Sequence, residues 1–230
     1  VLCEKPLVPT LAEALAMSEA AARTGQRLIE AYHHRFHPGV KRFVALAQTA
    51  VGQPIKIEAD FSITLPYGPD ELRWRADLGG GAMNDLGVYP LSLARMVAGR
   101  EPVCLSARAR MCHGVDEAMS VALDFGAGLT ADLRADMGER QHLRVWARVT
   151  GAEGRVTMTH FIAPQFGAEI ILERGGQISI ERPTRQSTYT FQLAAVVSGL
   201  QTGDLIETEG EEMLSQIKAL RAIYAQAGIT

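Results

Sequence analysis

The 230-residue sequence has little cysteine, few aromatic residues and no long apolar run. Its three cysteines, Cys3, Cys104 and Cys112, are odd in number and widely spaced, which argues against a disulfide framework and favours free thiols in a reducing compartment. No stretch approaches the roughly 18 consecutive apolar residues that a membrane span needs. Neither sign of charge is in excess, since 23 Lys and Arg oppose 26 Asp and Glu. We therefore expect a cytoplasmic protein with no nucleic-acid and no membrane partner.

What is present is typical of a folded domain. Hydrophobic residues make up 47% of the chain and charged residues 21%. A chain of this length buries enough surface to fold without disulfides or metal. It begins with an apolar triplet, Val1 to Cys3, that predicts a strand. Because a buried strand with no upstream partner leaves backbone groups unpaired, we expect an N-terminal portion to precede it.

The first third of the chain predicts alternating helix and strand. Thr10 and Glu13 fit a capping box that starts a helix, and Gly25 ends it. Residues 27–32 predict a short strand. Pro38 is typical of the first turn of a further helix, which ends near residue 52. This rhythm resembles the last part of a doubly wound α/β unit.

The rest of the chain predicts a large sheet. Residues 55–65 alternate strictly between apolar and polar, and shorter alternating runs follow at 103–111, 119–125, 129–137, 143–149, 168–173 and 177–181. Helices are expected over 80–98 and, from a second capping box at Thr208 and Glu211, over 208–227.

These elements predict an α+β fold: the end of a Rossmann-type α/β unit followed by a large, mostly antiparallel open sheet with covering helices. The domains implied are 1–33, a remnant of a dinucleotide-binding domain, and 34–230, a substrate-binding and oligomerisation domain. Since the helices suffice for one face of the sheet, we expect a homo-oligomer that forms through the other.

The segment from Asp77 to Pro90 is the strongest local signal. Its consecutive glycines, residues 79–81, indicate a close backbone approach or unusual dihedral angles. On a helix that follows them, Asp85 and Tyr89 are four residues apart and lie on one face. Pro90 predicts a kink there. The alternative is a glycine-rich turn entering an ordinary core helix.

Lys5, in the tripeptide Glu4-Lys5-Pro6, directly follows the first predicted strand. At the carboxyl end of a parallel strand it would lie where α/β proteins bind ligands, although a surface charge pair is the plain alternative. Reduction of a carbonyl by hydride transfer needs a proton donor. A phenol serves better if a nearby ammonium lowers its pKa, so Lys5 beside Tyr89 would suit that chemistry.

Four segments together resemble the Gfo/Idh/MocA family of NAD(P)-dependent oxidoreductases: 4–6, 32–38, 74–75 and 79–90. The resemblance implies that Lys5 contacts the nicotinamide ribose and assists catalysis, that Tyr89 is the catalytic acid/base, and that Asp85 lines the site. The cofactor side is expected to include Glu4, Lys5, Pro6 and Arg35, and the substrate side Trp74, Arg75 and Tyr89. The alternative for Arg35 is a backbone or carboxylate anchor near the cleft, and the alternative for Trp74 is an oligomer contact.

Tyrosine in place of the more common histidine is similar to the subgroup that contains glucose–fructose oxidoreductase, sugar 1-dehydrogenases and dimeric dihydrodiol dehydrogenase. This implies NADP or NAD as cofactor and a sugar or cyclic diol as substrate. Ser92 stands where a second acid often follows, which agrees with the tyrosine subgroup.

The family's Gly-x-Gly-x-x-Gly turn is absent from the sequence. Residues 126–131 come near to the pattern, but alternation continues on both sides, so they predict a hairpin. We expect the isolated chain to bind the cofactor weakly and to be inactive. The alternative function is a non-catalytic binding or oligomerisation module that has lost its nucleotide-binding domain.

Three clustered histidines, His33, His34 and His37, raise the possibility of a metal site. Pro38 disfavours the helical geometry that would align them, and no nearby cysteine completes a zinc pattern. No metal is expected.

Overall fold

The computed structural model describes residues 1–139 and 142–229 of the chain. Its main feature is an eight-stranded mixed sheet in the order β10-β9-β8-β7-β3-β6-β5-β4. The strands are β3 (Pro54–Ser62), β4 (Val103–Cys112), β5 (Val115–Asp124), β6 (Thr130–Asp136), β7 (Arg144–Gly151), β8 (Gly154–Thr159), β9 (Ile170–Arg174) and β10 (Gln177–Glu181). The expectation of a large, mostly antiparallel sheet in an α+β fold is confirmed.

One pair departs from the antiparallel pattern. β3 pairs in parallel with β6 and antiparallel with β7, so it joins two antiparallel meanders, β4-β5-β6 and β7-β8-β9-β10. Alternation predicts a strand but does not say which neighbour it takes, and for this reason the parallel pair was not expected. β8 was not expected either.

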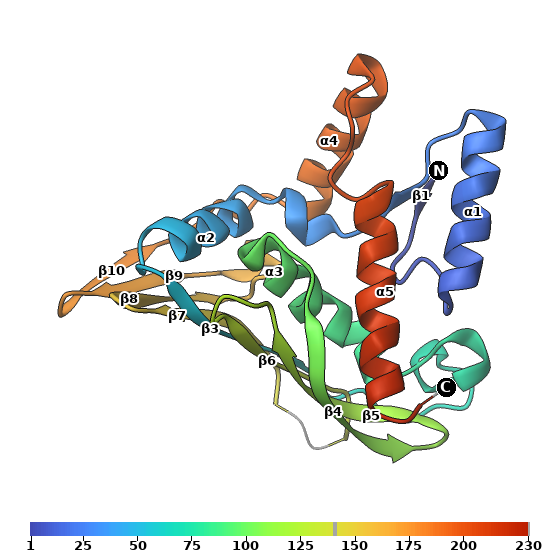
Figure 1. Cartoon of the computed structure of the whole chain (residues 1–230), viewed down its shortest axis with the longest axis horizontal. Coiled ribbons are helices and arrows are strands. Elements are labelled where there is room, and N and C mark those ends of the chain that lie inside the picture. Colours follow the sequence, from blue (N-terminus) through green and yellow to red (C-terminus); the bar gives the residue numbers. More distant parts are fainter. Residues whose placement is uncertain (140–141, 230) are drawn as a thin grey trace.

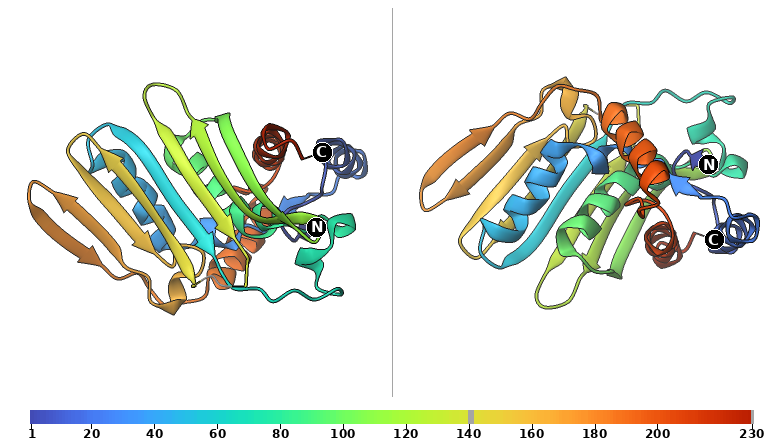
Figure 2. Two further views of the ribbon diagram at one scale, coloured as in Figure 1. Left: turned by 90° about the horizontal axis from the view of Figure 1, so that it is seen from below. Right: turned by 90° about the horizontal axis from the view of Figure 1, so that it is seen from above.

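Helices cover one face of the sheet and leave the other bare, as the two views of Figure 2 show. α2 (Pro38–Thr49), α3 (Val88–Ala98) and α5 (Glu211–Gln226) form this layer. The apolar face of β3, with Ile57 and Ala59, packs against it in the main core. The opposite face carries the alternate, mostly polar residues of the same strands.

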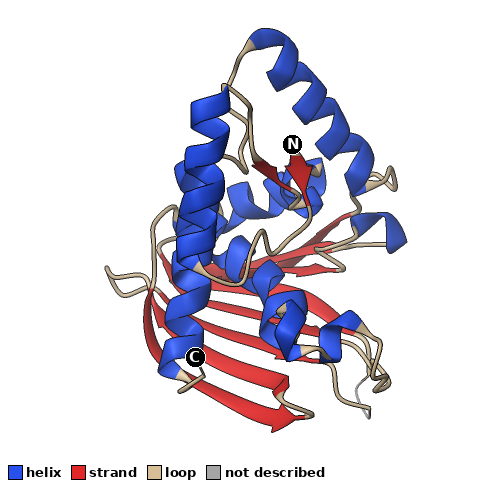
Figure 3. Ribbon diagram, turned by 90° about the vertical axis from the view of Figure 1, so that its right-hand side faces the viewer, coloured by secondary structure: helices blue, strands red, loops and turns tan. Residues whose placement is uncertain are grey.

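The N-terminal elements lie beside α5, away from the sheet (Figure 3). β1 (Leu2–Cys3) pairs in parallel with β2 (Ile29–Glu30), and α1 (Leu11–Thr24) packs on α5 in a small core of its own. The capping box at Thr10 and Glu13 is confirmed, and Gly25 ends α1 with a φ of 65°.

α4 (Thr188–Thr202) projects from the body on the side opposite the sheet (Figure 1). The sequence did not predict it. The second capping box is wrong: α5 begins at Glu211, and its N-cap is Gly210 rather than Thr208. Short 3₁₀ helices complete the fold: η1 (His33–Phe36), η2 (Leu72–Trp74), η3 (Ala76–Leu78) and η5 (Pro164–Phe166). Among the described residues, no helix is both long and apolar enough to cross a bilayer.

Candidate functional site

A cleft of about 970 Å³ opens where the chain leaves β1. The segment from Glu4 to Pro9 forms one wall, and the turns that precede α3 form another. Tyr189 of α4 closes one side, and Phe61, at the end of β3, contributes apolar surface. The cleft therefore lies at the carboxyl end of a parallel strand, the expected ligand edge of such a pair.

The helix that carries the site starts with a π-helical turn, η4 (Met83–Gly87), and becomes α3 at Val88. In π-helical spacing, the residue that would donate to the carbonyl of Asp85 is Pro90, which has no N–H. That carbonyl accepts instead from Lys5, with Nζ at 2.6 Å. The expected irregularity at Pro90 is present, and it takes the form of a π turn rather than a kink at Tyr89.

Lys5, Asp85 and Arg73 form a charged network on the cleft wall. The ammonium of Lys5 also lies 2.7 Å from Oδ1 of Asp85, and Nε of Arg73 lies 2.9 Å from Oδ2. The Lys5 side chain is only 9% exposed, whereas that of Arg73 is 43% exposed. One buried and one exposed cation thus hold both oxygens of a single carboxylate.

Tyr89 is buried below this network. The Nζ of Lys5 lies 5.0 Å from the centre of its ring. Its hydroxyl lies 3.3 Å from Nε2 of His33, which is the partner recorded for it among the described residues. The structure therefore brings Tyr89, Lys5 and Asp85, which are distant in sequence, to one cleft.

The expected lowering of the Tyr89 pKa by Lys5 is wrong. Burial raises the pKa of Tyr89 above its ordinary value, and the charges of Asp85 and Glu4 add to the effect. The ammonium of Lys5 bonds to Asp85 and not to the phenol oxygen. Tyr89 is thus held as a neutral phenol, a form that donates a proton only when a stronger base develops beside it.

The glycine segment before η4 packs closely, as its sequence predicts. A Cβ on Gly80 would lie 2.7 Å from the carbonyl oxygen of Arg73. Gly81 has a φ of 120°, and a Cβ on it would lie 2.0 Å from Oδ1 of Asp116. Asp116 accepts from the amide of Met83 at 2.7 Å and from the hydroxyl of Tyr224 at 2.9 Å. A buried carboxylate therefore fixes the start of η4.

Trp74 and Arg75 do not line this cleft, contrary to expectation. Trp74 is buried beside Tyr67 and His113 and faces a separate pocket, because the short helix η2 turns it away. Arg75 pairs with exposed Asp77 on the surface. It is Arg73, two residues earlier, that reaches the cleft.

Arg35 also lies away from the cleft lining. It forms an ion pair with Glu212 of α5, which agrees with the alternative prediction of a carboxylate anchor. The structure thus does not place it among residues that would contact a cofactor, because its guanidinium is already held by Glu212. Glu4, Lys5 and Pro6, by contrast, all line the cleft.

Glu30, in β2, is a buried carboxyl with one satisfied oxygen. Oε1 accepts from the amide of Leu7 at 2.8 Å, while Oε2 has no hydrogen-bond partner within residues 1–139 and 142–229. Burial raises its pKa to about 7, against the opposing charges of Arg35 and Arg95. In the unfolded chain a glutamate has a pKa of about 4.3.

This shift predicts the pH dependence of the Glu30→Gln variant. Between about pH 4.3 and 7 the folded protein retains a proton that the unfolded chain has released, so the Glu30 contribution to stability falls as the pH rises. Glutamine removes the ionisation, so the variant should be more stable than wild type by about 1–3 kcal/mol at pH 8 and nearly equal at pH 4.5. Urea unfolding at both values measures this. An equal difference at the two pH values would contradict it.

The clustered histidines have separate surroundings. Nδ1 of His37 accepts from the amide of Gly39 at 3.0 Å and caps α2. His33 bonds Tyr89 and also Thr188, the first residue of α4. His33, Arg73 and Tyr189 were missed as site residues. His33 lies inside the segment 32–38 but was weighed only as a metal ligand, Arg73 had no signal beyond adjacency to the segment 74–75, and Tyr189 lies in a helix that was not predicted.

Comparison with known proteins agrees with this architecture. Residues 44–157 match the profile described as the GFO/IDH/MocA C-terminal domain. The chain is 31% identical over 231 residues to the D-xylose 1-dehydrogenase (NADP(+)) 2 of Haloferax volcanii, an alignment that spans 99% of this chain and 70% of that protein. It is 37% identical over 164 residues to the trans-1,2-dihydrobenzene-1,2-diol dehydrogenase of Danio rerio, over 68% of this chain and 46% of that one.

Solved structures show the same fold. An aldose-aldose oxidoreductase from Caulobacter crescentus, solved with glycerol, superimposes with a TM-score of 0.91 at 26% identity over 99% of this chain and 70% of its own. KijD10, a 3-ketoreductase from Actinomadura kijaniata solved with NADP and TDP-benzene, superimposes with a TM-score of 0.89 at 23% identity over 98% of this chain and 70% of its own.

Proposed function

This chain belongs to the Gfo/Idh/MocA family, and we propose that it transfers a hydride between a nicotinamide cofactor, NADP or NAD, and a sugar or cyclic diol. The observation that carries the proposal is the convergence of a buried phenol, Tyr89, and a buried ammonium, Lys5, on one cleft. The named activities of the xylose and dihydrodiol dehydrogenases agree with it.

The cleft fits a nicotinamide cofactor together with a small substrate. Its volume of about 970 Å³ is at the upper end of ligand sites, about 300–1,000 Å³, and exceeds the need of a single sugar. Glu4, Lys5 and Pro6 would hold the nicotinamide end, because they line the cleft at the carboxyl end of β1. When bound, this group supplies or accepts the hydride. Residues 1–33 would thus form the cofactor side and residues 34–230 the substrate side.

Tyr89 is the proposed acid/base. As a carbonyl is reduced, negative charge grows on its oxygen, and a neutral phenol beside it donates the proton that this oxygen needs. Lys5, held by Asp85, keeps a positive charge 5.0 Å from the Tyr89 ring and favours the negative oxygen during the transfer. In alcohol oxidation the same atoms act in reverse.

The mixed lining of the cleft fits a polyhydroxylated ring. Asp85 and Arg73 are partly exposed and present charge-assisted hydrogen-bond partners to hydroxyl groups. Phe61 and Ile162 offer the apolar surface that the faces of a sugar or a cyclic diol need.

The test is an activity screen of the protein expressed from its complete reading frame. We expect reduction of NADP⁺ or NAD⁺, followed by the absorbance of the reduced nicotinamide, in the presence of an aldose such as D-xylose or a cyclic trans-diol. Absence of turnover with both cofactors across aldoses and cyclic diols would refute the proposed function and favour a non-catalytic module.

Two neighbouring arginines provide a matched pair for the substrate side. Arg73→Ala removes the exposed cation from the cleft, so we expect KM for the sugar or diol to rise about tenfold, as for the loss of one charge-assisted hydrogen bond. Arg75→Ala removes a surface pair with Asp77 outside the cleft and should leave KM unchanged. Equal effects of the two changes would contradict the assignment of Arg73.

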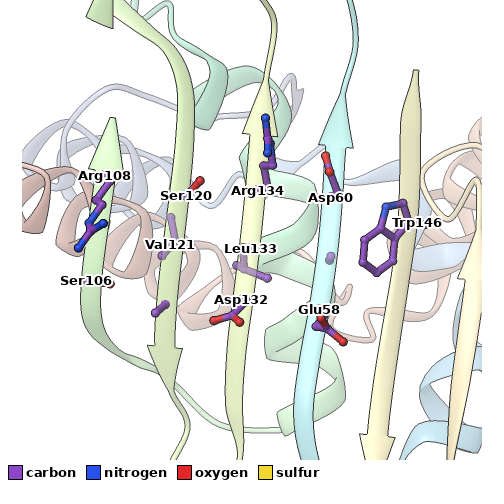
Figure 4. A pocket seen from close by; sticks show the side chains of 12 residues that line it. Glu58, Asp60, Ser106, Arg108, Ser120, Val121, Asp132, Leu133, Arg134 and Trp146 are labelled. Atoms are coloured by element: carbon purple, nitrogen blue, oxygen red, sulfur yellow. The ribbon is translucent and has the colours of Figure 1, made fainter. Parts of the chain in front are cut away.

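We also propose that a second copy of the chain covers the bare face of the sheet. Figure 4 shows acidic side chains on β3 and β6 and basic ones on β6 and β4, with Trp146 beside Asp60. The acidic residues are Glu58, Asp60 and Asp132, and the basic ones include Arg108 and Arg134. A surface with both signs of charge can match a two-fold copy of itself.

Light scattering tests this assembly. We expect at least a dimer for the wild type and a monomer for Trp146→Glu, because the change places a fourth acidic side chain at the centre of the face. Leu205→Glu is the control: Leu205 is exposed and comes three residues after the end of α4, the helix that projects on the side opposite the sheet (Figure 1). A monomeric wild type, or equal behaviour of the two variants, would contradict the proposed interface.

A further inference from the structure

The buried hydroxyl of Tyr89 needs a partner that exchanges protons with it. Tyr89 is 7% exposed, and Lys5, whose Nζ lies 5.0 Å from the ring centre, already bonds two oxygen atoms of Asp85. Within the described part of the chain, the hydrogen bond recorded for the phenol oxygen is the one to Nε2 of His33 at 3.3 Å. His34 is fully buried and also packs on the Tyr89 ring, edge to face, but neither of its nitrogens has a recorded partner there.

His33 is held in a fixed orientation from both sides. Its Nδ1 lies 2.9 Å from Oγ1 of Thr188, which is fully buried at the start of α4. The ring of Tyr189, the next residue, stacks on the imidazole with 4.4 Å between the ring centres. Three separate elements, η1, α3 and α4, thus align Tyr89, His33 and Thr188 in one hydrogen-bonded chain.

The direction of these hydrogen bonds follows from the chemistry of the groups. Burial keeps Tyr89 protonated, and a neutral phenol is a better donor than acceptor, so Tyr89 donates to Nε2. Nδ1 then carries the imidazole proton and donates to Thr188. In this state Nε2 has a lone pair that faces the phenol proton.

We propose that His33 is the proton acceptor behind Tyr89: it takes the phenol proton when the substrate hydroxyl gives its own to Tyr89. This inference rests on the proposed function. In alcohol oxidation, the substrate O–H bond breaks and a new O–H bond forms on Tyr89, while the original Tyr89 O–H bond breaks and an N–H bond forms at Nε2. The imidazolium then returns one proton to water. In carbonyl reduction each transfer is reversed. Because His33 acts through Tyr89, it is a positioning and relay residue and does not touch the substrate.

The surroundings of His33 keep its imidazole neutral before this step and favour release of the proton after it. Burial lowers its pKa to about 4, and the positive charge of Lys5 adds to the effect. The imidazole is therefore neutral near pH 7, and the proton that it receives leaves readily. The titratable groups that face or adjoin the imidazole are Lys5, His34, Arg35, Tyr89 and Tyr189.

The first test is the pH profile of His33→Gln in the protein expressed from its complete reading frame. Glutamine accepts a hydrogen bond but cannot take the proton. We expect kcat to fall about 10- to 100-fold near pH 7 with KM within twofold. We also expect log kcat to rise with a slope of about one per pH unit, because the phenol proton must then leave to hydroxide, whereas wild type stays flat between pH 6 and 9. A purely structural role would lower kcat by the same factor at every pH, and that result would overturn the inference.

Four further variants guard against a folding defect. His33→Ala should regain activity in a saturable manner when imidazole is added, because the free base fills the vacated site. Thr188→Val should lower kcat several-fold while Thr188→Ser retains it, since serine keeps the hydroxyl that holds Nδ1. The same His→Gln change at His142, on the loop before β7, should leave kcat unchanged. Failure of the imidazole rescue together with equal rates for the two Thr188 variants would contradict the relay.

A spectroscopic measurement separates this inference from the proposed function, because it needs neither cofactor nor substrate. We expect the ¹⁵N spectrum of the chain to show His33 protonated at Nδ1, with an Nε2 shift that changes in Tyr89→Phe. A His33 protonated at Nε2, or a shift insensitive to Tyr89→Phe, would overturn the relay. An inert wild type with the expected spectrum would refute the oxidoreductase activity and leave in place only the hydrogen-bonded chain from Tyr89 through His33 to Thr188.

Discussion

Tyr89→Phe should lower kcat for the sugar or diol by about 10²- to 10⁴-fold, the usual contribution of a positioned acid/base group. The substitution removes one oxygen atom and keeps the ring. The edge-to-face contact of that ring with Phe61, 5.9 Å between centres, and the approach of Lys5 both remain. The loss thus reports the proton transfer and not the shape of the cleft.

Binding and stability should change little in the same variant. KM should stay within a few-fold, since Asp85 and Arg73 still face the substrate. Loss of the hydrogen bond to His33 should cost about 1 kcal/mol of unfolding free energy. Tyr67→Phe is the control, because Tyr67 stacks on His113 outside the cleft. A Tyr89→Phe enzyme with near-normal kcat would exclude the phenol as acid/base.

Gly81→Ala should destabilise the protein by about 3–5 kcal/mol, a large effect for one methyl group. At a φ of 120° any side chain is strained, which costs about 1–3 kcal/mol. The new Cβ would also lie 2.0 Å from Oδ1 of Asp116. Moving Asp116 breaks its bonds to the amide of Met83 and the hydroxyl of Tyr224, and each buried donor left unpaired costs about 1–3 kcal/mol.

Gly114→Ala separates the two causes. Gly114 lies in the β4–β5 turn with a φ of 85°, and no atom lies within 4 Å of the position of its Cβ. The strain alone should cost about 1–2 kcal/mol there. Urea unfolding of both variants measures the difference. If the two changes cost the same, the contact with Asp116 contributes nothing to the placement of η4.

Sequence reasoning succeeded where a local pattern has one physical meaning. Thr10 with Glu13 predicted the start of α1, and strict alternation predicted β3 to within one residue at its start and three at its end. Sequence reasoning did not predict α4, because this helix buries polar and small residues and exposes apolar ones, the opposite of an ordinary amphipathic helix. Its buried side includes Thr188, Gln192 and Gly199, while Leu193 is exposed.

The candidate site was predicted by residue type but not by geometry. The cleft brings together Lys5, Asp85 and Tyr89. Nothing in the sequence indicates that the Lys5 ammonium would bond to Asp85 rather than to the phenol oxygen of Tyr89. Nor could spacing tell that η2 turns Arg73, and not Arg75, toward the cleft. Such choices depend on how turns are oriented by distant packing, which no short motif encodes.

The position of β3 between the two meanders also affects the order in which the chain assembles. Each meander is built from strands that are neighbours in sequence and can pair as soon as they are made, whereas β3 must join β6 and β7 from far earlier in the chain. Until it inserts, β6 and β7 both present open hydrogen-bonding edges, which are templates for aggregation. Recovery of native protein after refolding should therefore depend on this one strand more than on any other.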